Sequence, residues 1–171
     1  MANTSITNEK RAVYLLVPPT SGSGDGTYYR LGEGINTITP ANNGQISTKH
    51  YVNAKFATSR RNGLQKQWAF SGDRVVGDQC NDYLYSLSEE TGSDVETYLI
   101  IADLSGTSPY TAKKYKVMID LSNDGSIEGG QDVAIDGTIY ANGDPVEGTV
   151  VITSATETTA ETAVFTATSS T

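Results

Sequence analysis

The sequence contains one cysteine, Cys80, among its 171 residues, so it cannot form an internal disulfide. Nothing therefore requires an oxidising compartment for folding. No apolar run approaches the roughly 20 residues that a membrane-spanning helix needs. Residues 1–10 are polar and lack the apolar core of a signal peptide. From these absences we expect a protein that folds in a cytoplasm and has no membrane partner.

Charges of one sign are missing from two long stretches. Residues 34–72 contain no aspartate or glutamate, and no lysine or arginine follows Lys116. The whole chain has 12 basic and 20 acidic residues and a formal net charge of −8 at pH 7. Surfaces of opposite charge can meet inside one subunit or between copies of it. The cations of the first stretch are Lys49, Lys55, Arg60, Arg61 and Lys66, and the acidic residues of the second are Asp120, Asp124, Glu128, Asp132, Asp136, Asp144, Glu147, Glu157 and Glu161.

The sequence has no catalytic or metal-ligating constellation. His50, the only histidine, has no cysteine or carboxylate near it in sequence, which a metal site or a general base would need. The segment Gly32-Glu33-Gly34 lacks the third glycine and the following helix of a phosphate-binding loop. The acidic segment 120–128 does not have the ligand spacing of a calcium-binding loop. We therefore expect no enzyme and no cofactor.

The residues that are abundant indicate β-structure. Thr, Ser, Val and Gly are frequent, and 10 tyrosines outnumber 3 phenylalanines, a composition typical of half-buried strands and turns. Short apolar runs and alternating patterns predict most of the strands. The predicted strand segments are Arg11 to Pro18, Tyr28 to Leu31, Leu64 to Phe70, Val95 to Leu104, Lys114 to Leu121, Ile127 to Tyr140, Val146 to Ile152 and Val164 to Thr166.

Residues 73–90 have the periodicity of an amphipathic helix. Apolar side chains recur there at spacings of three and four and give one stripe that would pack on the strands. Ser71 or Asp73 would cap its start, and Gly92 follows its end. The order of strands, one helix and further strands predicts a mainly β fold: two packed antiparallel sheets, as a β-sandwich or partly closed barrel, with one flanking helix. The predicted helix stripe consists of Val76, Cys80, Tyr83, Leu84 and Leu87.

We expect one domain over residues 1–171, with flexible arms at residues 1–10 and 154–171. Residues 34–63 are expected to form a long extended loop, with turn signals at Pro40 and at Asn42-Asn43-Gly44. The loop has few large apolar residues, and a two-stranded ribbon alone is marginal in water, so we predict that it lies on a neighbouring subunit. The predicted inter-subunit contacts are Lys49, His50, Tyr51, Lys55, Arg60 and Arg61.

Six short motifs follow one another over about Val13 to Ile152. They are Tyr29 to Ile35 (YRLGEGI), Thr37 to Thr39 (TIT), Asn42 to Gln45 (NNGQ), Thr48 to Lys55 (TKHYVNAK), Gln67 to Gly72 (QWAFSG) and Gly143 to Val150 (GDPVEGTV). Their order and spacing resemble those of the major tail proteins, or tail tube proteins, of long-tailed, non-contractile phages of Gram-positive bacteria. That family more often has acidic residues after the Tyr-Val pair, where this chain has Asn53-Ala54.

This resemblance implies a structural protein of the virion. Proteins of that family form hexameric rings that stack into a tube with a continuous β-barrel wall. A long loop, here residues 34–63, reaches the adjacent ring, and the terminal arms help. The resemblance also implies assembly in the cytoplasm of a bacterial host, with tape-measure and tail-terminator proteins as partners. Genomic DNA would pass through an acidic lumen without specific binding. Clustered cations on the wall would instead retain the DNA by binding its phosphates.

Two other functions fit parts of the sequence. The Thr-rich strands and the segment Val146 to Thr168 suggest a monomeric immunoglobulin-like decoration or adhesion module, which would leave the cationic stretch without a role. The tyrosines and Trp68 suggest a carbohydrate-binding module. Stacking on sugars needs exposed rings, however, and Trp68 and Tyr83 lie in apolar patterns typical of a core. Both functions are kept as alternatives to the tail-tube interpretation.

Overall fold

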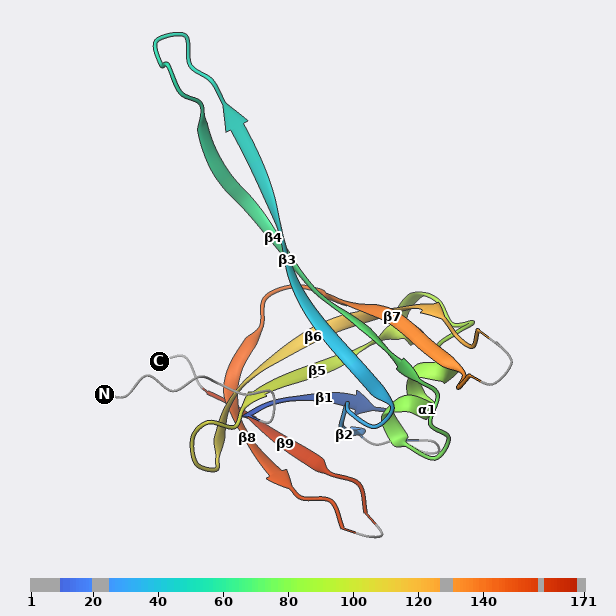
Figure 1. The fold of residues 1–171 in the computed structure, drawn as a ribbon. Helices are drawn as coiled ribbons and strands as arrows, with labels where there is room; N and C mark the ends of the chain where they lie inside the picture. The colour runs from blue at the N-terminus through green and yellow to red at the C-terminus, as the bar shows by residue number, and fades with distance from the viewer. Residues whose placement is uncertain (1–9, 20–24, 127–130, 157–158, 169–171) are drawn as a thin grey trace.

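The structure of the protein is a computed structural model that describes residues 10–19, 25–126, 131–156 and 159–168. It confirms the predicted fold class, since the described chain is mainly β with one α-helix packed beside the strands (Figure 1). The elements are β1 (Arg11–Val17), β2 (Thr27–Arg30), β3 (Ile35–Lys49), β4 (Thr58–Asp73), α1 (Gln79–Ser86), the 3-10 turn η2 (Gly92–Val95), β5 (Glu96–Asp103), β6 (Tyr110–Asn123), β7 (Ala134–Ala141), β8 (Val146–Thr153) and β9 (Thr162–Ala167).

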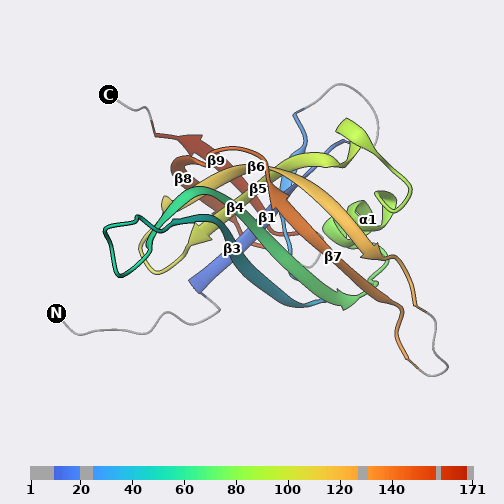
Figure 2. The same ribbon diagram turned by 90° about the horizontal axis from the view of Figure 1, so that it is seen from above.

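All of these strands belong to one antiparallel hydrogen-bonded network. Its order is β3-β4-β7-β6-β5-β1-β2-β9-β8, and β8 also pairs with β6. The first half of β6 therefore closes a ring with β5, β1, β2, β9 and β8, which we call the ring, while its second half pairs with β7. The sheet continues from β7 into β4 and β3, which cross over β1 at an angle (Figure 2). The result is a partly closed barrel with an attached sheet.

Strands β1 and β5 stand between two cores and contribute side chains to each, whereas β6 alternates and exposes residues such as Lys113 and Lys116. On β5, for example, Leu99 packs into one core and the next residue, Ile100, into the other. This explains why β1 and β5 have continuous apolar runs instead of a simple alternation. The larger core lies beneath β4 and α1 and includes Leu15, Trp68, Phe70, Leu84, Leu99, Tyr115, Val117, Ile119, Ile135 and Ile139. The smaller core fills the ring with Ala12, Tyr14, Ile100, Ala102, Ala112, Val150 and Ala163.

Helix α1 covers Gln79–Ser86 and is shorter than the predicted helix over residues 73–90. Asp73, the first residue of the predicted helix, is the last residue of β4, and residues 74–78 connect this strand to α1. Gly77 in this connection has φ +98°, a left-handed conformation that a right-handed helix does not contain. The helix is capped by Asp78, whose side chain accepts a hydrogen bond from the Asn81 backbone N–H at 2.8 Å. The caps expected from sequence therefore lie too early, inside β4.

The predicted helix stripe is placed on the core except for its first member. Cys80, Leu84 and Leu87 are buried, and Tyr83 packs against the same core from a partly buried position. The prediction is wrong for Val76, which precedes the helix and is 83% exposed. Burial raises the pKa of the Cys80 thiol, and the thiol donates a hydrogen bond to a backbone carbonyl at 3.4 Å. Cys80 is thus an unreactive core residue.

The structure bears on the two predicted arms to different extents. Residues 1–9 of the amino-terminal arm (1–10) lie outside the described residues, and the carbonyl of Lys10 accepts a hydrogen bond from the Leu104 N–H at 2.8 Å. The expected carboxy-terminal arm, residues 154–171, contains β9. This strand pairs along its length with β8 and at its start with β2. It therefore belongs to the ring and is not a free arm.

Candidate assembly surfaces

Strands β3 and β4 form a long hairpin, so residues 34–63 are not the extended loop predicted from sequence. Pairing runs from Ile35 opposite Gly72 to Lys49 opposite Thr58. The turn signals at Pro40 and Asn42–Gly44 lie inside β3, where pairing with β4 outweighs local turn preference. Proline is tolerated there because β3 is an edge strand, whose outer side has no ladder hydrogen bond to lose.

The outer part of this hairpin projects from the body of the subunit (Figure 1). Strand β4 pairs with β7 only between Gln67 and Asp73. Beyond that point, residues 42–66 pair with no strand outside the hairpin in the described part of the chain. We call residues 42–66 the outer hairpin. At about 3.3 Å per residue, the paired residues 42–49 alone extend it by roughly 26 Å.

All six predicted contact residues lie on the outer hairpin. Lys49 ends β3, while His50, Tyr51 and Lys55 belong to the connection between the strands. Arg60 and Arg61 are in β4, opposite Ser47 and Ile46. Every one of the six is exposed, and the structure shows no side-chain hydrogen bond or ion pair for them among the residues it describes. Their role as contacts remains a prediction, although the structure places them where a neighbour could reach them.

The outer hairpin also exposes large apolar side chains. Val52 is fully exposed and Phe56 is 79% exposed at the tip, and Ile46 and Leu64 are more than half exposed on the strands. The alternation of residues 64–70 puts Leu64 on the same face as Trp68 and Phe70, and the strand pairing agrees. Trp68 and Phe70 are buried on this face, whereas Leu64 is exposed because the body ends near Lys66. A concentration of exposed apolar side chains is characteristic of an interaction surface.

Lys66 marks the point where the hairpin leaves the body. Its Nζ lies 5.5 Å from the Trp68 ring centroid and 5.4 Å from that of Tyr115, and it donates a hydrogen bond to the Tyr115 hydroxyl at 3.4 Å. The two rings meet edge to face with centroids 4.9 Å apart. Lys66 is therefore bound to β6, unlike the cations further out. Trp68 is buried, so it offers no platform for a sugar.

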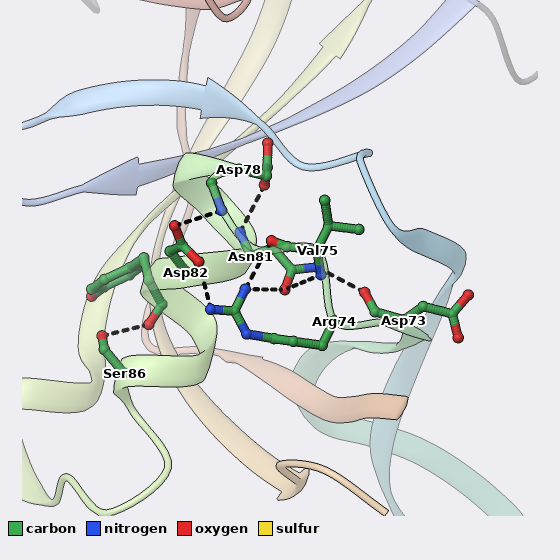
Figure 3. A network of polar contacts seen from close by, with 9 residues as sticks. Asp73, Arg74, Val75, Asp78, Asn81, Asp82 and Ser86 are labelled. Atoms are coloured by element: carbon green, nitrogen blue, oxygen red, sulfur yellow. Dashed lines mark hydrogen bonds and ion pairs between the residues drawn. The ribbon is translucent and has the colours of Figure 1, made fainter. Parts of the chain in front are cut away.

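The other end of β4 is fastened to α1 by Asn81, a fully buried side chain (Figure 3). Its Nδ2 donates to the Asp73 carbonyl at 3.0 Å, and its Oδ1 accepts from Arg74 Nη1 at 3.0 Å and from the Val75 N–H at 3.2 Å. The Asp73 N–H donates in turn to the Gly34 carbonyl at 2.8 Å. This network fastens both strands of the hairpin at the end where they enter the body.

Part of the acidic stretch gathers at this same end of β4. The Arg74 N–H, just after β4, donates a hydrogen bond to the Val133 carbonyl, just before β7, at 2.7 Å. This bond brings Asp132 close to Asp73. Asp136 follows on β7, opposite Ser71. We call Asp73, Asp132, Val133 and Asp136 the acidic end. It lies 13 residues of one strand away from Arg60, so roughly 40 Å separates the two charged regions.

The remaining carboxylates are distributed elsewhere. Glu128 and Glu157 lie outside the described residues. Glu147 accepts a hydrogen bond from Lys113 at 2.7 Å, and Glu161 pairs with Arg30 at 3.3 Å and accepts from the Tyr14 hydroxyl at 2.6 Å. Among the described residues the acidic stretch is therefore not one surface, and Asp132 and Asp136 are the members that lie at the end of β4 opposite the outer hairpin.

The described residues contain no group of three or more His, Cys, Asp or Glu side chains placed to hold a metal ion. No helix within the described ranges is long and apolar enough to cross a membrane. Two surface cavities of about 540 and 580 Å³ flank the base of the hairpin. Their linings combine apolar residues with cations such as Arg11 and Lys113, and the first also includes Asp103.

No family model and no curated protein sequence matches this chain. Its fold, in contrast, is similar to solved structures. A chain in the tail of an empty gene transfer agent particle, refined with C6 symmetry, aligns with a TM-score of 0.54 and 7% identity over 82% of this chain and 97% of that chain. A chain in the virion of a native gene transfer agent particle gives a TM-score of 0.55 and 5% identity over 82% and 97%.

A third similar structure comes from the baseplate of the anti-feeding prophage, determined with six-fold symmetrisation. It aligns with a TM-score of 0.53 and 9% identity over 86% of this chain and 97% of that chain. At such low identities the likeness shows the fold alone. The chain thus has a fold found in subunits of these tail, virion and baseplate assemblies.

Proposed function

We propose that this protein is the subunit of a phage-type tail tube, in which hexameric rings stack head to tail. The observation that carries the proposal is the outer hairpin, which projects from the body with exposed apolar and cationic side chains and has no partner strand among the described residues. The C6 and six-fold symmetries of two similar structures support six subunits per ring. The motif order favours the non-contractile tails of phages of Gram-positive bacteria.

Stacked rings need two different complementary surfaces on each subunit, because a head-to-tail contact joins unlike patches. The outer hairpin and the acidic end provide such a pair at opposite ends of β4. When identical subunits are stacked along the direction of β4, the cations of one subunit approach the carboxylates of the next. Opposite charges placed in this way favour the correct register and disfavour head-to-head contacts.

Contacts within a ring have a separate source. Strand β3 stands at the edge of the network and pairs only with β4 among the described strands. A long uncovered edge is prone to uncontrolled pairing, so proteins normally cover it. A neighbour in the ring would cover the edge of β3 and continue the sheet around the tube. The proposed role is structural, with tape-measure and tail-terminator proteins as further partners. The tube would be assembled in a bacterial cytoplasm, and DNA would pass through its lumen.

Negative-stain electron microscopy together with sedimentation tests this proposal. The purified protein should be monomeric or weakly associated when dilute, and should form rings and hollow tubes with six-fold averages when concentrated. An immunoglobulin-like decoration or adhesion module and a carbohydrate-binding module should both remain monomeric. A single small species over a wide concentration range, with no rings or tubes, would contradict the tail-tube proposal and favour these alternatives.

A further inference from the structure

The register of the outer hairpin divides its side chains between two faces. Residues directly opposite one another share a face, and the faces alternate along each strand. One face continues outward from Phe70, Trp68 and Lys66, and we call it the core-side face. Its outer members are Gly44, Ile46, Thr48, Ser59, Arg61 and Leu64. The opposite face, which we call the polar face, carries Asn43, Gln45, Ser47, Lys49, Thr58, Arg60 and Gln65.

Two contacts agree with this assignment. The hydroxyl oxygens of Thr48 and Ser59 lie 3.1 Å apart, as expected for neighbours on one face. The side chain of Arg61 lies across Gly44, since a Cβ added to this glycine would be 3.0 Å from Arg61 Nε. A bulge at residue 62 interrupts the register just before these pairs, and regular pairing resumes at Arg61 opposite Ile46. Arg60 and Arg61 are consecutive in β4 and so point to opposite faces, and the bulge decides that Arg61 is the one on the core-side face.

The two faces differ in their chemistry. The core-side face exposes Ile46 at 68% and Leu64 at 56%, with Arg61 between them on the ribbon. The polar face has no large apolar side chain between Asn43 and Lys49 or between Thr58 and Gln65. In the body the core-side face is covered, whereas beyond Lys66 nothing in the described subunit covers it. An apolar strip with a central cation is suited to a surface that offers apolar side chains and carboxylates together.

We infer that the core-side face is the docking face, that its partner is the acidic end of a second copy, and that the polar face stays in solvent. The acidic end has the required chemistry, because Val133 is 39% exposed beside Asp132 and Asp136. In the docked pair Arg61 meets a carboxylate while Ile46 and Leu64 are covered. Arg60 points away and contributes little. This inference rests on the proposed function and specifies which side of the hairpin performs it.

Matched single variants on the two faces test the inference. Arg61→Glu should raise the protein concentration needed for polymerisation about tenfold or more, because it places like charges across the contact, whereas Arg60→Glu should leave it within about twofold. The double variant Ile46→Ser/Leu64→Ser should also suppress tubes, and Gln45→Ser/Gln65→Ser is its control on the polar face. The readouts are sedimentation, negative-stain microscopy and thermal melting, which should show an unchanged body in all four variants.

A charge exchange identifies the partner. Asp132→Arg/Asp136→Arg should suppress polymerisation alone and should restore it when combined with Arg61→Glu in the same chain. If Arg60→Glu and Arg61→Glu impair assembly equally, or if only the variants of the polar face impair it, the docking face is assigned wrongly while the tail-tube function stands. If the exchange does not restore tubes, the acidic end is not the partner. If the unaltered protein forms no tubes, the proposed function fails and the inference fails with it.

Discussion

The outer hairpin and the ring are both antiparallel β-structure, yet they are stabilised in different ways. Ring strands such as β1 and β5 are covered on both faces, as Tyr14 and Leu15 show by packing into separate cores. The outer hairpin is covered on neither face and depends on its own ladder of hydrogen bonds. An isolated two-stranded ribbon is marginal in water. The ring can therefore fold within one subunit, whereas the outer hairpin needs a partner to become rigid.

The charges of the two regions follow the same division. The described ion pairs all lie in the body, and none involves the outer hairpin. They are Arg30–Glu161, Arg74–Asp82, Lys113–Glu147 and Lys116–Glu96. The cations of the outer hairpin have no carboxylate partner in the described subunit, which makes them free to pair with another copy. Changes in the hairpin should thus affect assembly, and changes in the body should affect stability.

The largest effect is expected from reversing both charges, Arg60→Glu/Arg61→Glu. Like charges across a repeated contact cost several kcal/mol, so tubes should be lost, while exposed substitutions usually change the free energy of unfolding by about 0.5 kcal/mol or less. Salt should partly restore assembly, since screening acts over about 10 Å at 0.1 M. Circular dichroism melts and negative-stain microscopy measure the two effects. A variant that fails to fold would place this part of the hairpin in the core.

The next largest effect should come from the larger core. Leu84→Ala removes a fully buried side chain of α1 and should lower the free energy of unfolding by about 2–5 kcal/mol. Val76→Ala is the matched control, because Val76 is exposed just before the helix. Chemical denaturation of the two dilute variants measures the difference. Similar unfolding midpoints for both would mean that α1 does not pack as the structure shows.

A smaller effect is expected at the junction between hairpin and body. Asn81→Ala leaves the Asp73 carbonyl and the Val75 N–H without their buried partner and should cost about 1–3 kcal/mol. Because the network also fastens the base of the hairpin, we expect tubes formed by this variant to be irregular even below its unfolding temperature. Thermal melting and the diameter distribution of tubes in micrographs test this. Regular tubes with unchanged stability would show that the network is dispensable.

The smallest expected effect concerns alkaline pH. Burial in the ring raises the pKa of Tyr28 from about 10 to about 12. A raised pKa in the folded state stabilises the fold below the unfolded-state value, and this stabilisation is lost as the pH rises from about 10 to about 12. Tyr28→Phe should therefore flatten the alkaline decline in stability. Tyr51→Phe, at an exposed position of the hairpin, is the control, and equal pH profiles for the two variants would contradict the half-buried position of Tyr28.

The sequence alone determined the fold class and where the unusual segment lies. Composition and alternation predict a mainly β protein with a flanking helix, and the core positions Cys80, Leu84 and Leu87 follow from local spacing. The absence of acidic residues from 34–72 locates the outer hairpin. Local patterns could not set the helix start, since the spacing that includes Val76 continues through a turn. The structure shows that the helix begins later, through the φ of Gly77 and the N-cap at Asp78.

The tertiary structure decided which strands pair and which face of each strand a side chain occupies. Strand pairing converts an expected loop into a hairpin, because the ladder between β3 and β4 outweighs turn preferences at Pro40 and Asn43. The short strand predicted over Val164 to Thr166 is part of β9, and its pairing with β8 and β2 makes it a strand of the ring and not part of a free arm. The faces of Arg60 and Arg61 depend on a bulge that adds one residue to β4. The period of a strand is two, so a single added residue exchanges its faces, and no local sequence pattern fixes where that residue is added.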